Sequence, residues 1–167
     1  SANNLHKRTS GIIVDGVEGC TVKLAKCCNP LPGDSLIGFI TRGYGISIHK
    51  KDCPNVALSK AKAETADRWV SAYWDKDDRA DNTRNLFESA ITICAEDRIS
   101  LIADITAALA EMKVSIYQIS SRNKSNGDVI ISIVIGAKNL EHVKSIVSRL
   151  KSVRSVIDVT RGYNASR

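Results

Sequence analysis

Two adjacent cysteines, followed at once by residues that force a turn, are the feature that most constrains how this chain can fold. The segment reads AKCCNPLPGDS. Neighbouring side chains on an extended strand point to opposite faces, so Cys27 and Cys28 can serve one site only where the backbone leaves the extended path. Pro30, Pro32 and Gly33 follow directly and predict a bend at this point.

A histidine and a third cysteine further along the chain would complete a metal site. Twenty residues separate Cys28 from His49, and three more residues precede Cys53. Three thiolates and one imidazole are a ligand set suited to a closed, tetrahedral structural zinc site. Such a cross-link would add much of the stability of a small domain with few aromatic residues. We therefore predict a zinc site formed by Cys27, Cys28, His49 and Cys53.

Two other interpretations of the cysteines stay open on the sequence. They could be ordinary residues of a small core, with His49 on the surface of a strand. Alternatively, Cys27 and Cys28 could close into a strained disulfide as a redox switch. Cys20 could replace one of the metal ligands, and Cys94 is most simply a lone thiol. An odd number of cysteines without a secretion signal favours reduced thiols or metal ligands over a disulfide framework.

The composition limits the size of the core and the class of partner. The chain has 167 residues, of which 43% are hydrophobic, enough for one moderate core or two small ones. Its formal net charge of +6 gives a bias toward anionic partners without a dense basic tract. No membrane-length apolar run and no signal peptide are recognisable, so we expect a cytoplasmic protein. Residues 1–3 look like a cloning remnant, so we expect an excised piece of a longer protein.

A polar segment divides the chain into two differently patterned regions. Residues 75–86 read as a linker between a first domain, residues 4–74, and a second domain, residues 87–167. The first domain is rich in β-branched and aromatic residues with glycine turns, which predicts hairpins in a small β-rich domain. Its expected elements are strands over residues 11–17, 35–41, 45–50 and 68–74 and a short helix over residues 57–66.

The second domain has a regular pattern of the order βαββαβ. Strands are predicted over residues 87–95, 114–122, 128–136 and 153–163, and helices over residues 100–113 and 139–151. Ser100 is a plausible N-cap of the first helix. We expect an α+β fold of the ferredoxin-like type, with four antiparallel strands and both helices on one face. The other sheet face would be solvated or would pair with another subunit. The apolar stripe of the second helix is predicted to be Leu140, Val143, Val147 and Leu150.

No catalytic motif is recognisable in the sequence. There is no Walker-type loop, no HExxH and no GxSxG, and His6 and His142 have no evident nucleophile or base partner. His142 lies on a predicted helix and is expected to face solvent. The charged loop before the helix that begins near Ser100 is either a solvated turn or a ligand loop, since helix N-terminal amides can bind an anionic group.

The segment VKLAKCCNPLPGDSLIGFITRGYGISIHKKDCPN resembles, almost position for position, the zinc-finger or RIS domain of long RelA/SpoT-type proteins. Its CC-x-P-x-PGD, GISIH and DC elements carry the resemblance together. The region after the linker resembles the ACT domain that ends those proteins, which synthesise and hydrolyse the alarmones ppGpp and pppGpp. The resemblance implies the C-terminal regulatory region of a GTP pyrophosphokinase, without its catalytic domains and therefore without enzymatic activity of its own.

The resemblance also implies partners. In that family this region docks on the ribosome against ribosomal RNA when uncharged tRNA occupies the A site, and it relays amino-acid starvation to the upstream catalytic domains. Lys and Arg side chains on phosphates supply most RNA affinity, which agrees with the basic bias of the chain. The residues that we expect on the RNA-binding surface are Lys26, Arg42, Lys50 and Lys51.

ACT domains in many enzymes bind amino acids at the first strand-to-helix loop, next to a neighbouring subunit. Such loops usually carry a glycine where this chain has Ser100, and an asparagine is common where it has Ser115, so both departures weaken the prediction of an amino-acid site. An amino-acid-sensing homodimer, formed by pairing of ACT sheets, is the alternative function that the resemblance implies. The loop in question is Asp97, Arg98, Ile99, Ser100 and Leu101.

Overall fold

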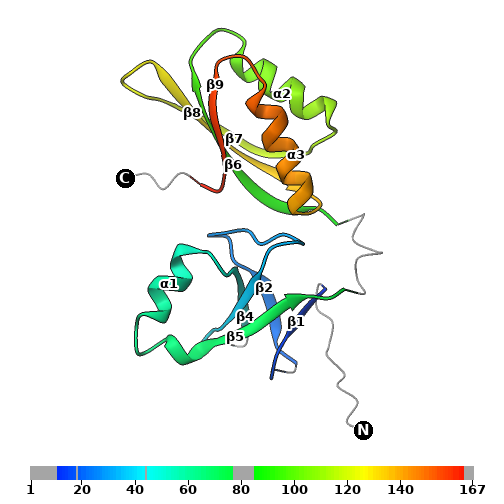
Figure 1. Cartoon of the computed structure of the whole chain (residues 1–167), viewed down its shortest axis with the longest axis vertical. Helices are drawn as coiled ribbons and strands as arrows, with labels where there is room; N and C mark the ends of the chain where they lie inside the picture. Colours follow the sequence, from blue (N-terminus) through cyan, green and yellow to red (C-terminus); the bar gives the residue numbers. More distant parts are fainter. Residues whose placement is uncertain (1–10, 18, 44, 77–84, 164–167) are drawn as a thin grey trace. The chain divides into compact units, whose positions relative to one another are not determined.

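The computed structural model describes residues 11–17, 19–43, 45–76 and 85–163, which belong to two compact units, Ser1–Thr83 and Arg84–Arg167 (Figure 1). Residues 1–3, His6 and most of the predicted linker lie outside the described residues. Each unit has its own sheet and its own hydrophobic core. Within the described ranges, no helix has both the length and the apolar character needed to cross a membrane.

The first unit is a five-stranded sheet in the order β1-β5-β3-β4-β2. Every neighbouring pair is antiparallel except β2 and β4, which are parallel. The sequence analysis does not predict β2, because this edge strand has four residues and none of them is fully buried. The strands are β1 (Ile12–Val14), β2 (Thr21–Leu24), β3 (Leu36–Ile40), β4 (Gly45–Lys50) and β5 (Trp69–Trp74).

The two faces of this sheet carry different chemistry. Gly38 pairs with Ile48, and Ile37 pairs with His49, so alternation along β4 puts an apolar residue on one face and the histidine on the other. On the histidine face, Ile37 packs in a small cluster with residues of the following loop and helix. The opposite face holds the main core of the unit, which contains Ile12, Val14, Leu36, Ile46, Ile48 and Ala72.

The helix of the first unit begins and ends earlier than the sequence predicts. The prediction was residues 57–66, whereas α1 spans Pro54–Lys60 and a short 3-10 helix, η1, spans Ala66–Arg68. The proline at the start of α1 fits there because the first helical turn needs no N–H from it. The helix ends where the Thr65 hydroxyl donates to the carbonyl of Ser59 at 2.6 Å, so a side chain satisfies a terminal acceptor.

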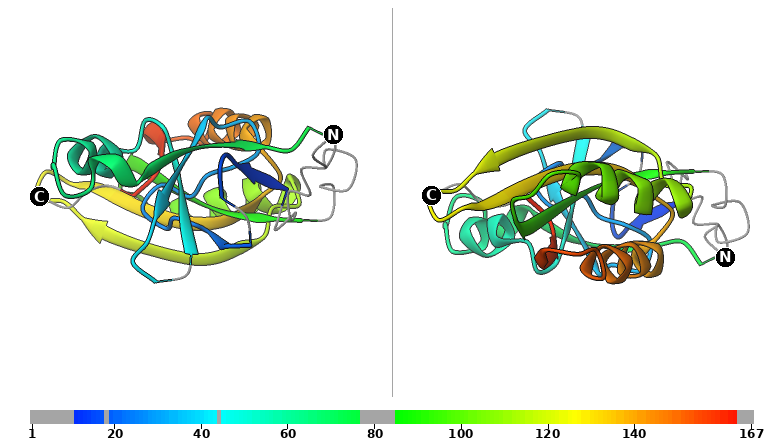
Figure 2. Two further views of the ribbon diagram at one scale, coloured as in Figure 1. Left: turned by 90° about the horizontal axis from the view of Figure 1, so that it is seen from below. Right: turned by 90° about the horizontal axis from the view of Figure 1, so that it is seen from above.

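The second unit confirms the predicted ferredoxin-like arrangement. Its four strands are antiparallel in the order β7-β8-β6-β9, and both helices cover the same face of the sheet (Figure 2). The sheet and the helices share one core, in which strand and helix side chains interleave. The elements are β6 (Phe87–Glu96), α2 (Leu101–Glu111), β7 (Ile116–Asn123), β8 (Asp128–Ala137), α3 (Leu140–Lys151) and β9 (Val156–Arg161).

The buried stripe of α3 differs from the predicted one. Ile146 is fully buried at 0% exposure, whereas Val147, which the sequence analysis placed on the stripe, only packs at its margin. Val143 and Leu150 are buried as predicted. Positions 146 and 147 both satisfy helical spacing from Val143, and the angle at which α3 lies on the sheet decides between them.

Two further local predictions need correction. Ser100 stands at the N-cap position of α2, but its φ of 69° is left-handed and its side chain makes no cap hydrogen bond.

His142 does not simply face solvent: its ring is half-buried, and Nδ1 accepts from the backbone N–H of Lys138 at 3.0 Å. Burial, with the nearby Lys138 charge, lowers the pKa of His142, which keeps the accepting, neutral ring present at pH 7. The observed cap of α3 is Asn139, whose side chain accepts from the backbone N–H of His142.

We predict that Ile146→Ala lowers the free energy of unfolding of the second unit by about 2–5 kcal/mol, because it leaves a cavity in a closed core. Val147→Ala is the matched control and should cost less, since its side chain is only partly buried. Native-state hydrogen exchange of the β6 and β8 amides measures this unit separately from the first. Equal losses in the two variants would contradict the observed orientation of α3.

Candidate metal centre

Four potential metal ligands from three segments of the first unit converge at one point. One ligand atom from each of Cys27, Cys28, His49 and Cys53 lies within 4.8 Å of every other. The Cys27 Sγ lies 3.7 Å from the Cys53 Sγ and 4.0 Å from the Cys28 Sγ. The His49 Nδ1 lies 3.4 Å from the Cys27 Sγ and 3.8 Å from the Cys28 Sγ.

Four of the six separations match those that a tetrahedral zinc ion requires, and all six lie within 4.8 Å. Zinc bonds of about 2.3 Å to sulfur and about 2.0–2.1 Å to nitrogen give tetrahedral edges of about 3.8 Å between sulfurs and about 3.5 Å between sulfur and nitrogen. The observed edges of 3.7–4.0 Å and 3.4–3.8 Å lie close to both values. The four residues therefore fit a closed structural site, in which the ion would cross-link the loops and leave no position for a substrate.

The backbone brings the adjacent thiols to one side by leaving the extended path, as the sequence predicts. The chain turns immediately after β2: the Asn29 N–H donates to the Ala25 carbonyl at 2.9 Å, and Asn29 takes a left-handed φ of 44°. The PLPGD segment then returns the chain toward β3, and the Asp34 carboxylate accepts from the Leu31 N–H at 2.7 Å. Cys53 joins the site from the residue just before α1.

Neighbouring groups orient the ligands. The His49 Nε2 lies 3.2 Å from the Ser47 Oγ, while Nδ1 faces the thiols. With Nδ1 as the metal ligand, the ring proton sits on Nε2 and donates to the Ser47 hydroxyl. The Lys50 backbone N–H donates to the Cys28 Sγ at 3.4 Å, which favours the thiolate form. Ligands and their partners together form one network over the end of β4.

Burial sets the protonation of this cluster in the absence of a metal. Burial, opposed by the Lys50 N–H and reinforced by the neighbouring Cys27 and Cys53, raises the pKa of Cys28 to about 12. Burial also lowers the pKa of His49 below its ordinary value of 6.5, so the imidazole is neutral at pH 7 and available as a ligand. Three thiols this close together are stable as thiolates only beside a cation.

The two remaining cysteines lie outside the cluster. Cys20, which the sequence analysis allowed as a substitute ligand, instead packs at the margin of the main core of the first unit. Strand alternation agrees with this placement, because Cys20 lies two residues before Val22 and four before Leu24, which pack against the same core. Cys94 belongs to β6 of the second unit and is half-buried. The spacing of the sequence alone does not separate these two from the ligands.

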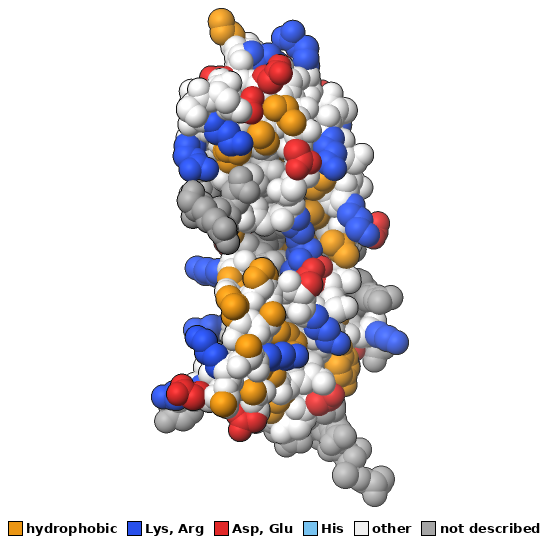
Figure 3. Space-filling model, turned by 60° about the vertical axis from the view of Figure 1, so that its left-hand side comes forward, with side chains coloured by type: hydrophobic (Ala, Val, Ile, Leu, Met, Phe, Trp, Pro, Cys, Tyr) orange, Lys and Arg blue, Asp and Glu red, His pale blue; other side chains and the backbone are white. Residues whose placement is uncertain are grey.

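The four basic residues predicted to bind RNA come from three different segments of the first unit. Arg42 follows β3 at the β3–β4 turn, whereas Lys50 and Lys51 lie at the other end of β4. Lys50 is also engaged in an ion pair with Asp52 at 3.4 Å. Figure 3 shows Lys and Arg side chains scattered over one face of the molecule among acidic and apolar ones. Lys26 lies in the turn beside the cysteines, so the assignment of all four to one RNA surface stays a prediction.

In the loop where the ACT resemblance implies amino-acid binding, the arginine is engaged in hydrogen bonds within the protein. The Arg98 guanidinium donates to Asp104 at 2.8 Å, to the Ser155 hydroxyl at 3.0 Å and to the Arg154 carbonyl at 3.0 Å. The bonds to Ser155 and Arg154 tie the β6–α2 loop to the turn before β9, while Ile99 is exposed. Amino-acid binding there stays a prediction, as does a homodimer formed by edge-to-edge pairing of ACT sheets, which sedimentation equilibrium would test.

Comparison with known families matches both units. The family model described as the RelA/SpoT RIS domain matches residues 12–75, and the model described as the ACT domain matches residues 83–161. These spans correspond to the two units that the structure separates. The centre of four ligands therefore lies within the RIS match, and the Arg98 loop lies within the ACT match.

Curated relatives match nearly the whole chain. A probable GTP pyrophosphokinase of Mycobacterium leprae is 36% identical over 93% of the chain, and the bifunctional (p)ppGpp synthase/hydrolase RelA of Mycobacterium tuberculosis is 35% identical over 93%. The chain spans only 19% and 20% of the lengths of these two relatives. The crystal structure of the ACT domain from GTP pyrophosphokinase of Chlorobium tepidum is 25% identical, with a TM-score of 0.41, and covers 46% of this chain and 99% of its own.

We predict that Cys28→Ser releases zinc and destabilises the first unit while the second stays folded. The wild type should carry about one zinc per chain and the variant much less, because a structural site needs all four ligands. Metal analysis after purification under reducing conditions measures the content, and tryptophan fluorescence follows unfolding, since Trp69 and Trp74 are both in the first unit. Cys94→Ser is the matched control and should keep its zinc; a metal-free wild type would contradict the assignment.

Zinc affinity should rise with pH across the neutral range. The Cys28 pKa of about 12 means that binding must displace a proton at any pH below that value. This proton alone gives about a tenfold gain in apparent affinity per pH unit. His49 adds little to the slope, because burial lowers its pKa below the ordinary value and its ring is mostly neutral in this range. Competition with a chromophoric chelator between about pH 6.5 and 8.5 measures the slope; a flat profile would show that Cys28 is not a ligand.

Proposed function

The chain belongs to the RelA/SpoT family, of which it carries the RIS and ACT domains, and we propose that it is the C-terminal regulatory region of a GTP pyrophosphokinase. In this proposal it binds ribosomal RNA and uncharged tRNA on cytoplasmic ribosomes and relays amino-acid starvation to catalytic domains of the same protein. Synthesis and hydrolysis of ppGpp are assigned to those domains, since the chain spans about a fifth of the length of its curated relatives.

One observation in the first unit carries this proposal: exposed basic residues lie on the same turns as the four potential metal ligands. Lys26 immediately precedes Cys27, and Lys51 lies between the ligands His49 and Cys53. Both lysines are exposed. A zinc ion at the centre would fix the backbone under these side chains, which reduces the entropy lost on binding a phosphate backbone.

Zinc itself is a proposed structural cofactor. The chemistry of the donor set, three thiolates and one imidazole, favours zinc over the oxygen-seeking cations magnesium and calcium. Its role would be to stabilise the turns. The protein's own side chains would supply the contacts to RNA, through charge-assisted hydrogen bonds from Lys and Arg to phosphate oxygens.

We expect the zinc-loaded chain to co-sediment with purified ribosomes, more strongly when uncharged tRNA is present, and to lose affinity steeply as salt rises. The double variant Arg42→Gln/Lys51→Gln should bind more weakly and with a shallower salt dependence, because each lost phosphate contact lowers the slope by about 0.7–0.9. Lys60→Gln/Lys62→Gln, with the same change of charge at the end of α1, is the matched control. No binding of folded, zinc-loaded protein at low salt would contradict the proposal.

A further inference from the structure

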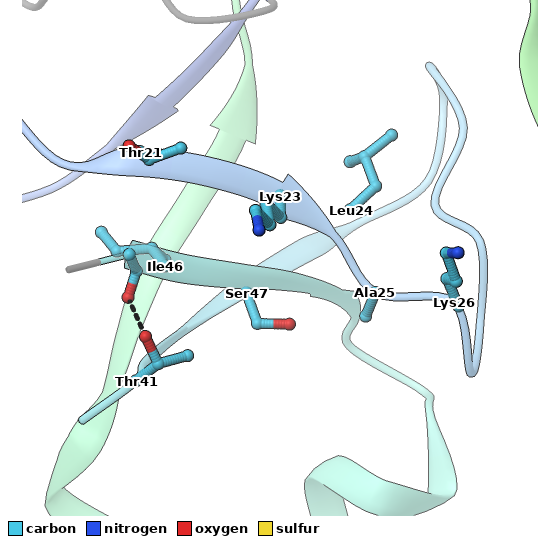
Figure 4. Close-up of a pocket in the computed structure, with 9 residues that line it drawn as sticks. Thr21, Lys23, Leu24, Ala25, Lys26, Thr41, Ile46 and Ser47 are labelled. Carbon is cyan, nitrogen blue, oxygen red and sulfur yellow. Dashed lines mark hydrogen bonds between the residues drawn. The ribbon is translucent and has the colours of Figure 1, made fainter. Parts of the chain in front are cut away.

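A cavity of about 590 Å³ lies on the first unit between β2 and β4, beside the metal centre but lined by none of its ligands. Its volume is within the range of sites that hold small molecules, about 300–1,000 Å³. Because β2 is an edge strand of the sheet, a ligand can enter from the side without displacing another strand. The residues that give it its chemistry are Thr21, Lys23, Lys26, Thr41 and Ser47 (Figure 4).

The parallel pairing of β2 with β4 assembles this cavity. It puts Lys23 directly across from Ser47 and Thr21 across from Gly45, on the same face of the sheet. Figure 4 shows Lys23 beside Ser47, with Leu24 turned to the other side of β2. Lys26 follows in the turn at the end of the strand, so two ammonium groups border one cavity.

The charge of the cavity is entirely positive. Its nine lining residues include two lysines and no acidic residue. Within the described ranges neither Lys23 nor Lys26 takes part in an ion pair. Two unpaired ammonium groups at one concave site favour an anion, and a phosphate ester offers the several oxygens that both could reach.

The hydroxyls add recognition of a sugar. The Thr41 Oγ1 already donates to the Gly45 carbonyl at 2.7 Å, so toward a ligand it can only accept. The Ser47 Oγ accepts from the His49 Nε2 when Nδ1 is the metal ligand, which leaves the Ser47 proton free to be donated. The cavity therefore combines cations for a phosphate with both an acceptor and a donor for ribose hydroxyls.

We propose that this cavity binds a ribose phosphate, with Lys23 and Lys26 on the phosphate oxygens and Ser47 and Thr41 on the sugar. The ligand is either one nucleotide unit of an RNA or a free nucleotide, which share this chemistry. The RNA source deepens and rests on the proposed function, because it names the unit of RNA that the first unit holds. Lys23, which the resemblance did not single out, becomes a principal phosphate contact.

Titration of the whole, zinc-loaded chain with ribose 5-phosphate, followed by amide chemical shifts in NMR, tests the cavity. We expect saturable shifts at residues 21–26, 41 and 45–47, and none with ribose alone. Lys23→Gln/Lys26→Gln should weaken binding at least about tenfold, because charge-assisted hydrogen bonds are lost. The equally charged control Lys60→Gln/Lys62→Gln should bind as the wild type does. Absence of saturable shifts, or equal weakening in both variants, overturns the proposal.

Two further probes distinguish the sources of the ligand. A short oligouridine that shifts the same amides, and binds more tightly than oligothymidine of equal length, supports RNA, because only RNA carries the 2′-hydroxyl. Tighter binding of guanosine 5′-monophosphate than of the oligouridine supports a free nucleotide. Cavity binding without ribosome co-sedimentation leaves this proposal standing and overturns the proposed function. Co-sedimentation with ribosomes, but no ligand binding in the cavity, overturns this proposal and leaves the proposed function standing.

Discussion

The first unit depends on four ligand atoms that converge from three segments of the chain. Its main core contains six buried apolar residues, and a smaller cluster around Ile37 lies on the other face of the sheet. Cys53 belongs both to that small cluster and to the ligand set, so packing and coordination act on the same residue. In a domain of this size, a metal cross-link between the turn after β2, the end of β4 and the start of α1 would replace the apolar contacts that a larger core supplies.

The second unit is stable for a different reason. Its two helices cover one face of the sheet, and the resulting core contains more buried residues than that of the first unit. Polar interactions there fix the loops: of the four hydrogen bonds that Arg98 donates, two join the β6–α2 loop to the turn before β9, one stays within the loop and one reaches Asp104 of α2. A loop whose arginine is satisfied internally offers fewer free donors to a ligand than the sequence pattern implies.

Two residues of the proposed binding cavity each adjoin a potential metal ligand in the first unit. Lys26 is followed directly by the ligand Cys27, and the Ser47 hydroxyl contacts the ligand His49. A metal ion would therefore order the turn that carries Lys26. Through His49, it would also fix the direction in which the Ser47 hydroxyl donates its hydrogen bond. With a metal bound, this coupling would make the ion a positioning element for the proposed anion site.

The sequence alone predicted the four residues of the candidate metal centre, with Cys20 left open as a substitute, the bend that joins the two thiols and the order of elements in the second unit. These follow from local chemistry: residue type, proline and glycine content, and periodicity. Only the tertiary structure decided that β2 pairs in parallel with β4, that Cys20 points to the core and that Ile146 rather than Val147 is buried. Each of these depends on contacts between segments far apart in the chain, which periodicity does not encode. The cavity that Lys23 lines also depends on the tertiary structure, because the pairing of β2 with β4 brings its lining residues together.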